Sequence, residues 1–315
     1  MEKYLALAPL AGYTDKAFRE IATAYGASFC VSEMVSAEAL ARGSRKTEAL
    51  MEPFDGERNL VVQLFGPDSD PFIRALPTLR ARNIKYIDIN AGCPVSKVVK
   101  TGSGSNLMTD MSRAERIIKT LKDSLDGVHV SIKFRLGWDK DSMNYIEFAH
   151  MACESGAEML TLHSRTRSQM YSGEADKTAF KRLRDEFPQN SSSPLLFASG
   201  DVFSAEDALY YISSLGADGV MFARGAIGNP FIIRETKELI EKGKYRRASI
   251  EEKVRTAIRH LHLAEKYYGE NYAVKEMRKH LMAYIKGEHN AARVKAELCR
   301  KETILEYEKL LETLV

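Results

Sequence analysis

Eight short apolar runs recur along residues 1–240, with helical patterns between them. The runs lack period-two alternation, as expected for parallel strands that are covered on both faces. The predicted strands are Leu5–Leu7, Phe29–Val31, Leu60–Phe65, Tyr86–Asn90, Val128–Phe134, Met159–His163, Leu195–Ala198 and Gly219–Phe222. Strand–helix units of about 31 residues, eight in number, match the closed parallel (β/α)8 or TIM barrel. A doubly wound open sheet is the alternative, but no Gly-x-Gly-x-x-Gly follows the first strand.

Start and stop signals predict the helices between these strands. Phe18, Ile21, Ala22 and Tyr25 share one helical face, which Gly26 ends. Further start signals are the capping box Ser112–Glu115, the N-cap Ser204 of a helix that Gly216 ends, and the pair Asn229-Pro230. One segment fits badly, because Pro77 falls inside the helix expected around 71–82 and should kink it.

Beyond Gly243 the pattern is purely helical, and we predict a separate helical domain over residues 241–315. Its expected helices run from the capping box Ser249–Glu252 to Gly269, from about Ala273 to Gly287, from Asn290, and from about Thr303. The segment 241–315 holds 17 lysines and arginines against 12 glutamates and no aspartate, while 1–240 hold 29 basic and 31 acidic residues. A basic appendage on a slightly acidic body can indicate a polyanionic partner, although many such charge runs are only solvated helix faces.

Composition excludes several classes of protein. Hydrophobic residues make up 44% and charged residues 28% of the chain, as in ordinary soluble globular proteins. The start Met1–Tyr4 leads directly into the first strand, which leaves no room for a signal peptide, and no apolar run approaches the ~18 residues that a membrane span needs. The four cysteines are scattered, with no spacing suited to zinc, so we expect no metal, no disulfide and a cytoplasmic location.

The loop after the fourth predicted strand presents a cysteine. Cys93 stands in the stretch Ile87–Pro94, between a glycine and a proline, and the flexible-looking segment Thr101–Ser105 follows. A thiol at the carboxyl end of a strand suits a nucleophile or an acid. A packed loop cysteine fits the motif equally well, because free cysteine is often buried as a small hydrophobe.

In a barrel, function gathers at the carboxyl ends of the strands. The loops after strands seven and eight commonly bind phosphate, and here they carry Ser199–Asp201 and Ala223–Gly225. Arg224 can neutralise a phosphate group. Lys133, on an apolar strand, could form a Schiff base or stabilise an anionic ligand. His163 ends another apolar strand, where a satisfied core histidine is a serious competitor.

With all strand ends in view, the chain closely resembles the flavin-dependent tRNA-dihydrouridine synthases, particularly a bacterial branch, over nearly its whole length. The matching motifs are Ala8–Asp15, Gln63–Gly66, Asp88–Pro94, Lys97–Gly104, Lys133–Arg135, His163–Arg167, Gln169–Gly173, Ser199–Asp201, Arg224–Pro230 and Arg278–Leu281. Three positions depart from common family patterns with other small residues: Ser164, Ser199 and Ala223.

The resemblance implies reduction of the C5–C6 double bond of selected uridines in tRNA, with FMN in the barrel and NADPH as reductant. It implies that Cys93 is the catalytic acid, which protonates C5 while hydride passes to C6, after the base has left its stack. Asn90 and Arg165 are expected to read the uracil. The residues expected around FMN are Pro9, Leu10, Ala11, Gln63, Lys133 and His163 at the ring, and Ser199, Gly200, Asp201, Ala223 and Arg224 at the phosphate.

The same resemblance assigns the helical domain to tRNA binding. Lys275, Lys279 and Lys286 lie near one predicted helical face, with Arg278 beside them. We expect a monomer with no obligate protein partner and no membrane association. Two other functions remain open: a small-molecule flavin oxidoreductase of the dihydroorotate dehydrogenase type, and a tRNA-binding protein without catalysis.

Overall fold

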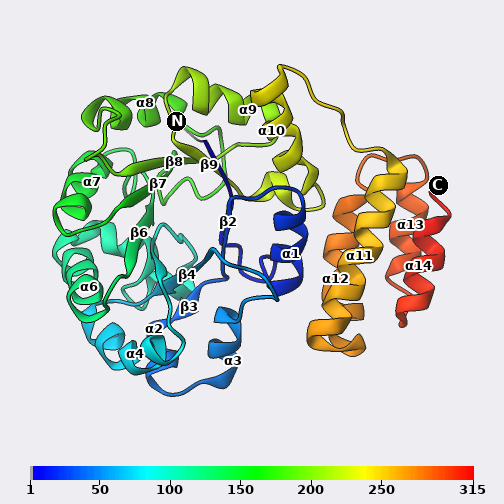
Figure 1. Cartoon of the computed structure of the whole chain (residues 1–315), viewed down its shortest axis with the longest axis horizontal. Helices are drawn as coiled ribbons and strands as arrows, with labels where there is room; N and C mark the ends of the chain where they lie inside the picture. The colour runs from blue at the N-terminus through cyan, green and yellow to red at the C-terminus, as the bar shows by residue number, and fades with distance from the viewer. Residues whose placement is uncertain (1–2) are drawn as a thin grey trace.

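A ring of eight parallel strands forms the centre of the computed structural model, which describes residues 3–315 (Figure 1). The strands are β1 (Tyr4–Leu7), β2 (Phe29–Val31), β4 (Leu60–Phe65), β5 (Tyr86–Ala91), β6 (His129–Phe134), β7 (Met159–His163), β8 (Leu195–Ser199) and β9 (Gly219–Phe222). The β2–β4 and β1–β9 pairings close the ring. The eight predicted strands and the barrel are therefore confirmed. A two-residue strand, β3 (Val35–Ser36), also pairs with β4 and was not predicted.

Helices cover the outside of the ring. They are α1 (Lys16–Ala24), α2 (Ala37–Ala41), α3 (Arg45–Glu48), α4 (Ser69–Ala81), α5 (Ser96–Val99), α6 (Met111–Ser124), α7 (Tyr145–Glu154), α8 (Lys177–Glu186), α9 (Ala205–Leu209) and α10 (Phe231–Lys242). Their apolar faces are buried against the strands, as Phe18 and Ile21 of α1 and Ile117 of α6 illustrate. Within residues 3–315, none of the helices combines the length and the apolar character that a membrane crossing requires.

The local signals at helix starts have mixed outcomes. Ser204 caps α9 as predicted. Asp207 completes a reciprocal capping box, which was not predicted. The predicted capping box Ser112–Glu115 is wrong, because α6 already begins at Met111 and its N-cap residue is Asp110. The Ser112 hydroxyl donates to the Asp110 carboxylate instead. Pro77 lies inside the continuous helix α4.

The predicted start of α10 is displaced by one residue. Pro230 occupies the N-cap position itself, and the helix runs from Phe231. The Asn229 side chain makes no cap and instead donates to the Gly225 carbonyl (3.4 Å). The amide of Asn229 therefore stabilises the loop after β9 rather than the helix end.

Four helices follow the barrel and lie beside α1 and α10 (Figure 1): α11 (Ile250–Tyr268), α12 (Glu270–Tyr284), α13 (Ala291–Leu298) and α14 (Ile304–Glu312). The predicted helices are confirmed, although α12 begins three residues earlier than expected. Ser249 and Thr303 cap α11 and α14. We call these helices the tail. They share an apolar core that also takes in Ala17 and Phe231 of the barrel helices, and a domain boundary at 240/241 stays a prediction.

The tail packs directly on loops at the carboxyl end of the barrel. Gly228, with φ +68°, lies so close to α12 that a Cβ on it would stand 2.3 Å from the Ala283 carbonyl carbon. The Lys279 ammonium lies 5.1 Å from the centre of the Tyr13 ring, and the His280 ring contacts Tyr13 edge-on at 5.2 Å. The loops after β1 and β9 are therefore in contact with the tail.

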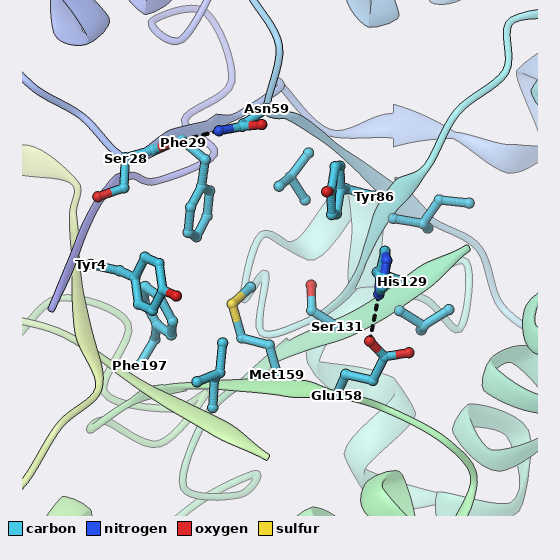
Figure 2. A pocket seen from close by; sticks show the side chains of 14 residues that line it. Tyr4, Ser28, Phe29, Asn59, Tyr86, His129, Ser131, Glu158, Met159 and Phe197 are labelled. Carbon is cyan, nitrogen blue, oxygen red and sulfur yellow. Dashed lines mark hydrogen bonds and ion pairs between the residues drawn. The ribbon is translucent and has the colours of Figure 1, made fainter. Parts of the chain in front are cut away.

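At its other end the barrel holds an apolar hollow of about 310 Å³ (Figure 2). We call it the N-terminal hollow. Phe29 and Tyr4 lie beside Phe197, with ring centres 5.5 and 6.1 Å from its own. At the rim, the His129 ring nitrogen Nδ1 lies 2.6 Å from the Glu158 carboxylate. Aromatic side chains therefore make up much of the lining of the N-terminal hollow.

Candidate active site

A cleft of about 530 Å³ opens at the carboxyl ends of the strands. The structure brings most of the predicted site residues to its wall, from six different strands and their loops. They are Pro9, Leu10, Ala11, Asn90, Cys93, Lys133, His163, Ser199, Gly200, Asp201, Ala223 and Arg224. Two predicted residues, Gln63 and Arg165, do not line the cleft and lie beneath it.

The Cys93 loop is held from both sides. The Asn90 side-chain oxygen accepts from the backbone N–H groups of Gly92 (3.2 Å) and Cys93 (2.9 Å). The Cys93 carbonyl accepts from both the N–H and the hydroxyl of Ser105 (3.1 and 3.0 Å). Gly104 has φ +61°, and a Cβ there would lie 2.8 Å from the Cys93 carbonyl oxygen. The segment expected to be flexible is therefore a packed support of the loop.

The thiol of Cys93 is suited to act as an acid. Burial raises the pKa of the Cys93 thiol, against the smaller opposing effects of the Val95 N–H, Arg135 and Lys133. A raised pKa keeps the thiol protonated at neutral pH, which is the state that a proton donor needs. A nucleophilic cysteine would instead need a lowered pKa.

Two nitrogen groups face the cleft without partners. Burial, and then the charge of Arg135, lowers the pKa of Lys133 to about 8. Its ammonium has no hydrogen-bond partner among residues 3–315. Burial also lowers the pKa of His163 well below its usual value, and its Nε2 has no partner within the described residues. Both side chains line the cleft, so their nitrogens are available to a group bound there.

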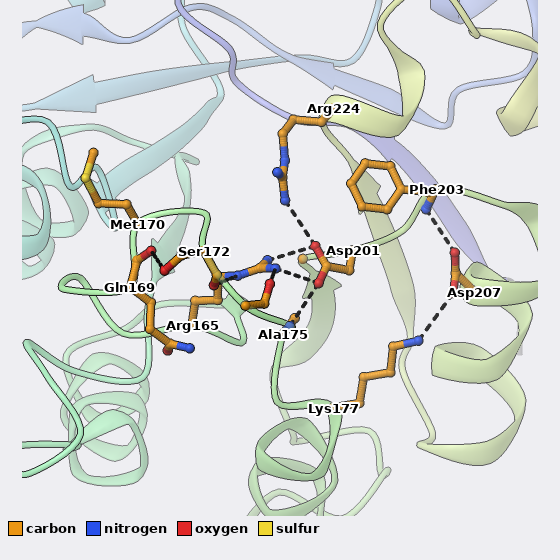
Figure 3. A network of polar contacts seen from close by, with 12 residues as sticks. Arg165, Gln169, Met170, Ser172, Ala175, Lys177, Asp201, Phe203, Asp207 and Arg224 are labelled. Atoms are coloured by element: carbon orange, nitrogen blue, oxygen red, sulfur yellow. Dashed lines mark hydrogen bonds and ion pairs between the residues drawn. The ribbon is translucent and has the colours of Figure 1, made fainter. Parts of the chain in front are cut away.

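Asp201 stands at the centre of a network of polar contacts after β8, beside the cleft (Figure 3). Its carboxylate accepts two hydrogen bonds from Arg165 (2.8 and 2.6 Å) and one from Arg224 (3.0 Å). Arg165 is 2% exposed and also donates to the carbonyls of Ser172 and Gly173. The prediction that Arg165 reads the substrate thus has no support from its position, because Arg165 lies beneath the cleft and holds Asp201. Arg224 stays partly exposed at the cleft wall.

Two glycines allow close packing of the loops at this side of the cleft. A Cβ on Gly225 would lie 2.1 Å from the Val202 carbonyl oxygen, so only glycine lets the loops after β8 and β9 approach each other. Gly200 has φ +108°, and a Cβ there would lie 3.2 Å from the His163 ring. Beside these closely packed turns, the partly exposed Arg224 guanidinium could neutralise a phosphate group.

Asn90 and Gln63 have their polar atoms committed to the protein. The Asn90 amide nitrogen donates to the Gln63 side-chain oxygen (2.8 Å), and its oxygen holds the Cys93 loop. Gln63 is fully buried and donates to Asp88 (2.6 Å). These contacts favour a supporting role for both amides rather than direct contact with a ligand.

Two side chains of the cleft wall, Arg135 and Tyr171, lie within the matching motifs but were assigned no role from the sequence. Arg135 donates to the Gly92 carbonyl (2.7 Å) and to the carbonyls of Thr166 and Met170 (both 2.9 Å). The Tyr171 ring lies 4.8 Å from the Arg224 guanidinium carbon. A signal for Arg135 was present, because it lies two residues after Lys133, where a strand's side chains return to the same side.

The four tail residues predicted to bind tRNA differ in their surroundings. Lys275 and Lys286 are exposed, but Lys286 lies beyond the end of α12. Lys279 pairs with Glu276 near the cleft mouth. Arg278 donates to the Tyr307 hydroxyl (2.7 Å) and the Lys301 carbonyl (3.0 Å), which ties α12 to α14.

Fold and site together define a (β/α)8 barrel with a cleft at the carboxyl ends of its strands, whose wall carries Lys133, Arg135 and Arg224. Solved structures share the fold: histamine dehydrogenase from Rhizobium sp. 4-9 matches with a TM-score of 0.56 at 14% identity, over 82% of this chain and 48% of that one. Morphinone reductase matches with a TM-score of 0.51 at 11% identity, over 74% of this chain and 86% of that one. At these identities the likeness concerns the fold alone.

The chain belongs to the dihydrouridine synthase family, whose model, described as Dihydrouridine synthase (Dus), matches residues 6–314. A protein of Treponema pallidum named probable tRNA-dihydrouridine synthase is 38% identical over 93% of this chain and 86% of its own length. The tRNA-dihydrouridine synthase B of Pasteurella multocida is 34% identical over 91% of this chain and 85% of its own length. The resemblance read from the motifs is confirmed.

Proposed function

We propose that this protein is a tRNA-dihydrouridine synthase that reduces the C5–C6 double bond of uridines in tRNA, with FMN in the cleft and NADPH as reductant. The observation that carries the proposal is the half-buried thiol of Cys93, whose pKa burial raises, held at the wall of a cleft that also carries Arg224. Four free cysteines suit an enzyme of the reducing cytoplasm, and we expect it to act as a monomer.

The cleft offers matching groups for both ends of FMN. Arg224 and the turns at Gly200 and Gly225 would hold the phosphate, and Pro9, Leu10 and Ala11 would line the ring. The unpartnered nitrogens of Lys133 and His163 would meet polar edges of the ring, where a cation favours a reduced flavin with negative charge. When bound, the flavin would supply hydride to C6 of the uracil.

The chain's own residues would then deliver the proton. Cys93 would protonate C5, because its raised pKa keeps the proton on the thiol until the base lies in the cleft. Asn90 and Ser105 would fix the loop that carries the thiol, since both bind its backbone. Burial of the site would exclude water from the reacting atoms.

We propose the tail as the surface that holds tRNA beside the cleft. Its excess of basic residues suits a phosphate backbone, and α12 contacts the loops after β1 and β9, which border the cleft. The target base would have to leave its stack to reach Cys93.

The purified protein tests the proposal directly. It should be yellow, lose the flavin absorbance on addition of NADPH, and form dihydrouridine in tRNA taken from cells that lack the gene. Turnover of free orotate without action on tRNA would support a dihydroorotate dehydrogenase instead. A colourless protein that binds tRNA without modifying it would contradict the enzymatic function.

A further inference from the structure

A row of buried polar side chains crosses the interior of the barrel beneath the Cys93 loop. Gln63 on β4, Asp88 on β5 and Ser131 on β6 are neighbours in the strand register. Gln63 and Asp88 are fully buried, and Ser131 is nearly so. Burying a carboxyl group among apolar side chains is costly unless the group is fully hydrogen-bonded. The mechanism proposed above gives Asp88 no part.

Hydrogen bonds connect Asp88 to Cys93 in one direction. The Gln63 amide nitrogen donates to Asp88 Oδ2 (2.6 Å), and the Asn90 amide nitrogen donates to Gln63 Oε1 (2.8 Å). The backbone N–H of Cys93 then donates to Asn90 Oδ1 (2.9 Å). The other carboxyl oxygen of Asp88 accepts from the Ser131 hydroxyl (2.6 Å), so both of its oxygens act as acceptors.

An acceptor at the start of this chain fixes the orientation of both amides. A side-chain amide has one donating and one accepting end, so turning it exchanges the two. Because Asp88 accepts, Gln63 must point its nitrogen toward Asp88 and its oxygen toward Asn90. Asn90 must then point its nitrogen toward Gln63, which leaves its oxygen for the N–H of Cys93.

We propose that Asp88 is a positioning residue for Cys93, which acts by setting the direction of the Gln63–Asn90 hydrogen-bond chain. A donor in place of Asp88 would let both amides turn over, so that the Asn90 nitrogen would face the N–H of Cys93. Two donors would then oppose each other, and the Cys93 loop would lose its anchor. The inference rests on the proposed function for the role of Cys93, but the direction of the chain can be measured without turnover.

A double-mutant cycle tests the direction. Asp88→Asn keeps the size of the side chain but adds a donor. Gln63→Glu sets a second carboxylate against Asp88, and their repulsion should displace the side chain at position 63 from both Asp88 and Asn90. In the double variant, the new amide at position 88 can donate to the new carboxylate at position 63, which also accepts from Asn90. The original orientation of Asn90 is thereby restored, so the two changes should compensate rather than add.

The first measurement is the rate at which iodoacetamide alkylates Cys93. A Cys153→Ser/Cys299→Ser background removes the two other reachable thiols, because Cys30 is buried. Each single change should raise this rate by about threefold or more, as the loop loosens. The double variant should return to within about twofold of the background. Ser131→Ala is the matched control, because it removes a donor to Asp88 without reversing the chain, and it should change the rate by less than about twofold.

The second measurement is turnover, with bound flavin recorded for every variant. Each single change should lower kcat for dihydrouridine formation by about 10- to 100-fold, with little change in KM for tRNA, and the double variant should recover most of the loss. Background alkylation rates in both single variants would overturn the proposal, as would a double variant impaired at least as much as the worse single one.

Folding failures can also be interpreted. If a single variant does not fold but the double variant does, compensation is shown, whereas failure of the double variant alone contradicts the proposal. A background protein that does not act on tRNA would contradict the proposed function, while the alkylation cycle would still decide the role of Asp88.

Discussion

The two ends of the barrel are built from the same eight strands but differ in kind. The N-terminal hollow is lined by aromatic side chains such as Phe29 and Phe197, whose burial stabilises the fold. The cleft at the other end holds the Lys133 ammonium, whose pKa burial lowers, and the buried Nε2 of His163 without a partner among the described residues, and both cost stability. We therefore expect mutations in the N-terminal hollow to lower the free energy of unfolding and to leave kcat unchanged. Mutations in the cleft should lower kcat and leave the free energy of unfolding unchanged or higher.

The largest effect is expected at Cys93. Cys93→Ala removes the proposed proton donor, and a general acid typically contributes ~10²–10⁴-fold in rate. Dihydrouridine formation should fall by about that factor, while flavin content and reduction by NADPH stay near those of the parent protein. If Cys93→Ala forms dihydrouridine at the rate of the parent protein, Cys93 is not the proton donor.

The opposite signature is expected at Phe197 in the N-terminal hollow. Phe197→Ala deletes a fully buried ring, and such deletions cost about 3–5 kcal/mol in stability. Urea unfolding should show this loss, while kcat per folded molecule stays unchanged. A variant with normal stability but low kcat would break the division between the two ends.

Lys133 should make the stability of the flavin-free protein depend on pH. Its pKa is about 8 in the folded protein and 10.5 in an unperturbed lysine. Between these values the unfolded chain holds a proton that the folded protein has released, so stability should rise with pH, with a slope approaching about 1.4 kcal/mol per pH unit.

The variant Lys133→Met isolates this contribution. It is similar in size and cannot titrate, so it should lack this part of the slope and be the more stable protein below pH 8. Unfolding curves from pH 7 to 11 provide the measurement. If the stabilities of the two proteins change with pH in parallel, the folded protein does not lower the pKa of Lys133.

Arg224→Ala should weaken the hold on flavin. A charge-assisted hydrogen bond contributes roughly 1.5–3 kcal/mol, so the flavin Kd should rise by about 10- to 150-fold. The bound fraction follows from absorbance after dialysis. Lys177→Ala is a useful control, because Lys177 pairs with Asp207 outside the cleft wall. Undiminished flavin affinity in Arg224→Ala would move the phosphate site elsewhere.

The smallest effect is expected in the tail. Replacing Lys275, Lys279 and Lys286 with alanine should weaken tRNA binding without changing NADPH oxidation. Each lost phosphate contact should flatten the slope of log K against log[salt] by about 0.7–0.9. Lys279 already pairs with Glu276, so its share should be reduced. If affinity and slope both stay constant, these lysines lie on a solvated surface only.

The parts of the molecule that local patterns encode could be predicted from the sequence. Each barrel strand is an apolar run of its own, and Ser249 and Thr303 cap their helices through residues three positions away. Long-range pairing decided the rest. Nothing near Arg165 indicates that Asp201, 36 residues later, draws its guanidinium beneath the cleft. The two-residue strand β3 is too short to carry a pattern.

The close approach of Gly228 to α12 limits how the molecule can be recombined. A chimaera that splices the tail of a relative onto this barrel at residues 243–249 would keep the covalent link but could lose the fit, because the incoming helix must present a residue as small as Ala283 opposite Gly228. Substitutions in the loop after β9 and in α12 are thus expected to depend on each other at this contact. A tail taken from a relative should fit only if the relative's loop after β9 is transferred with it.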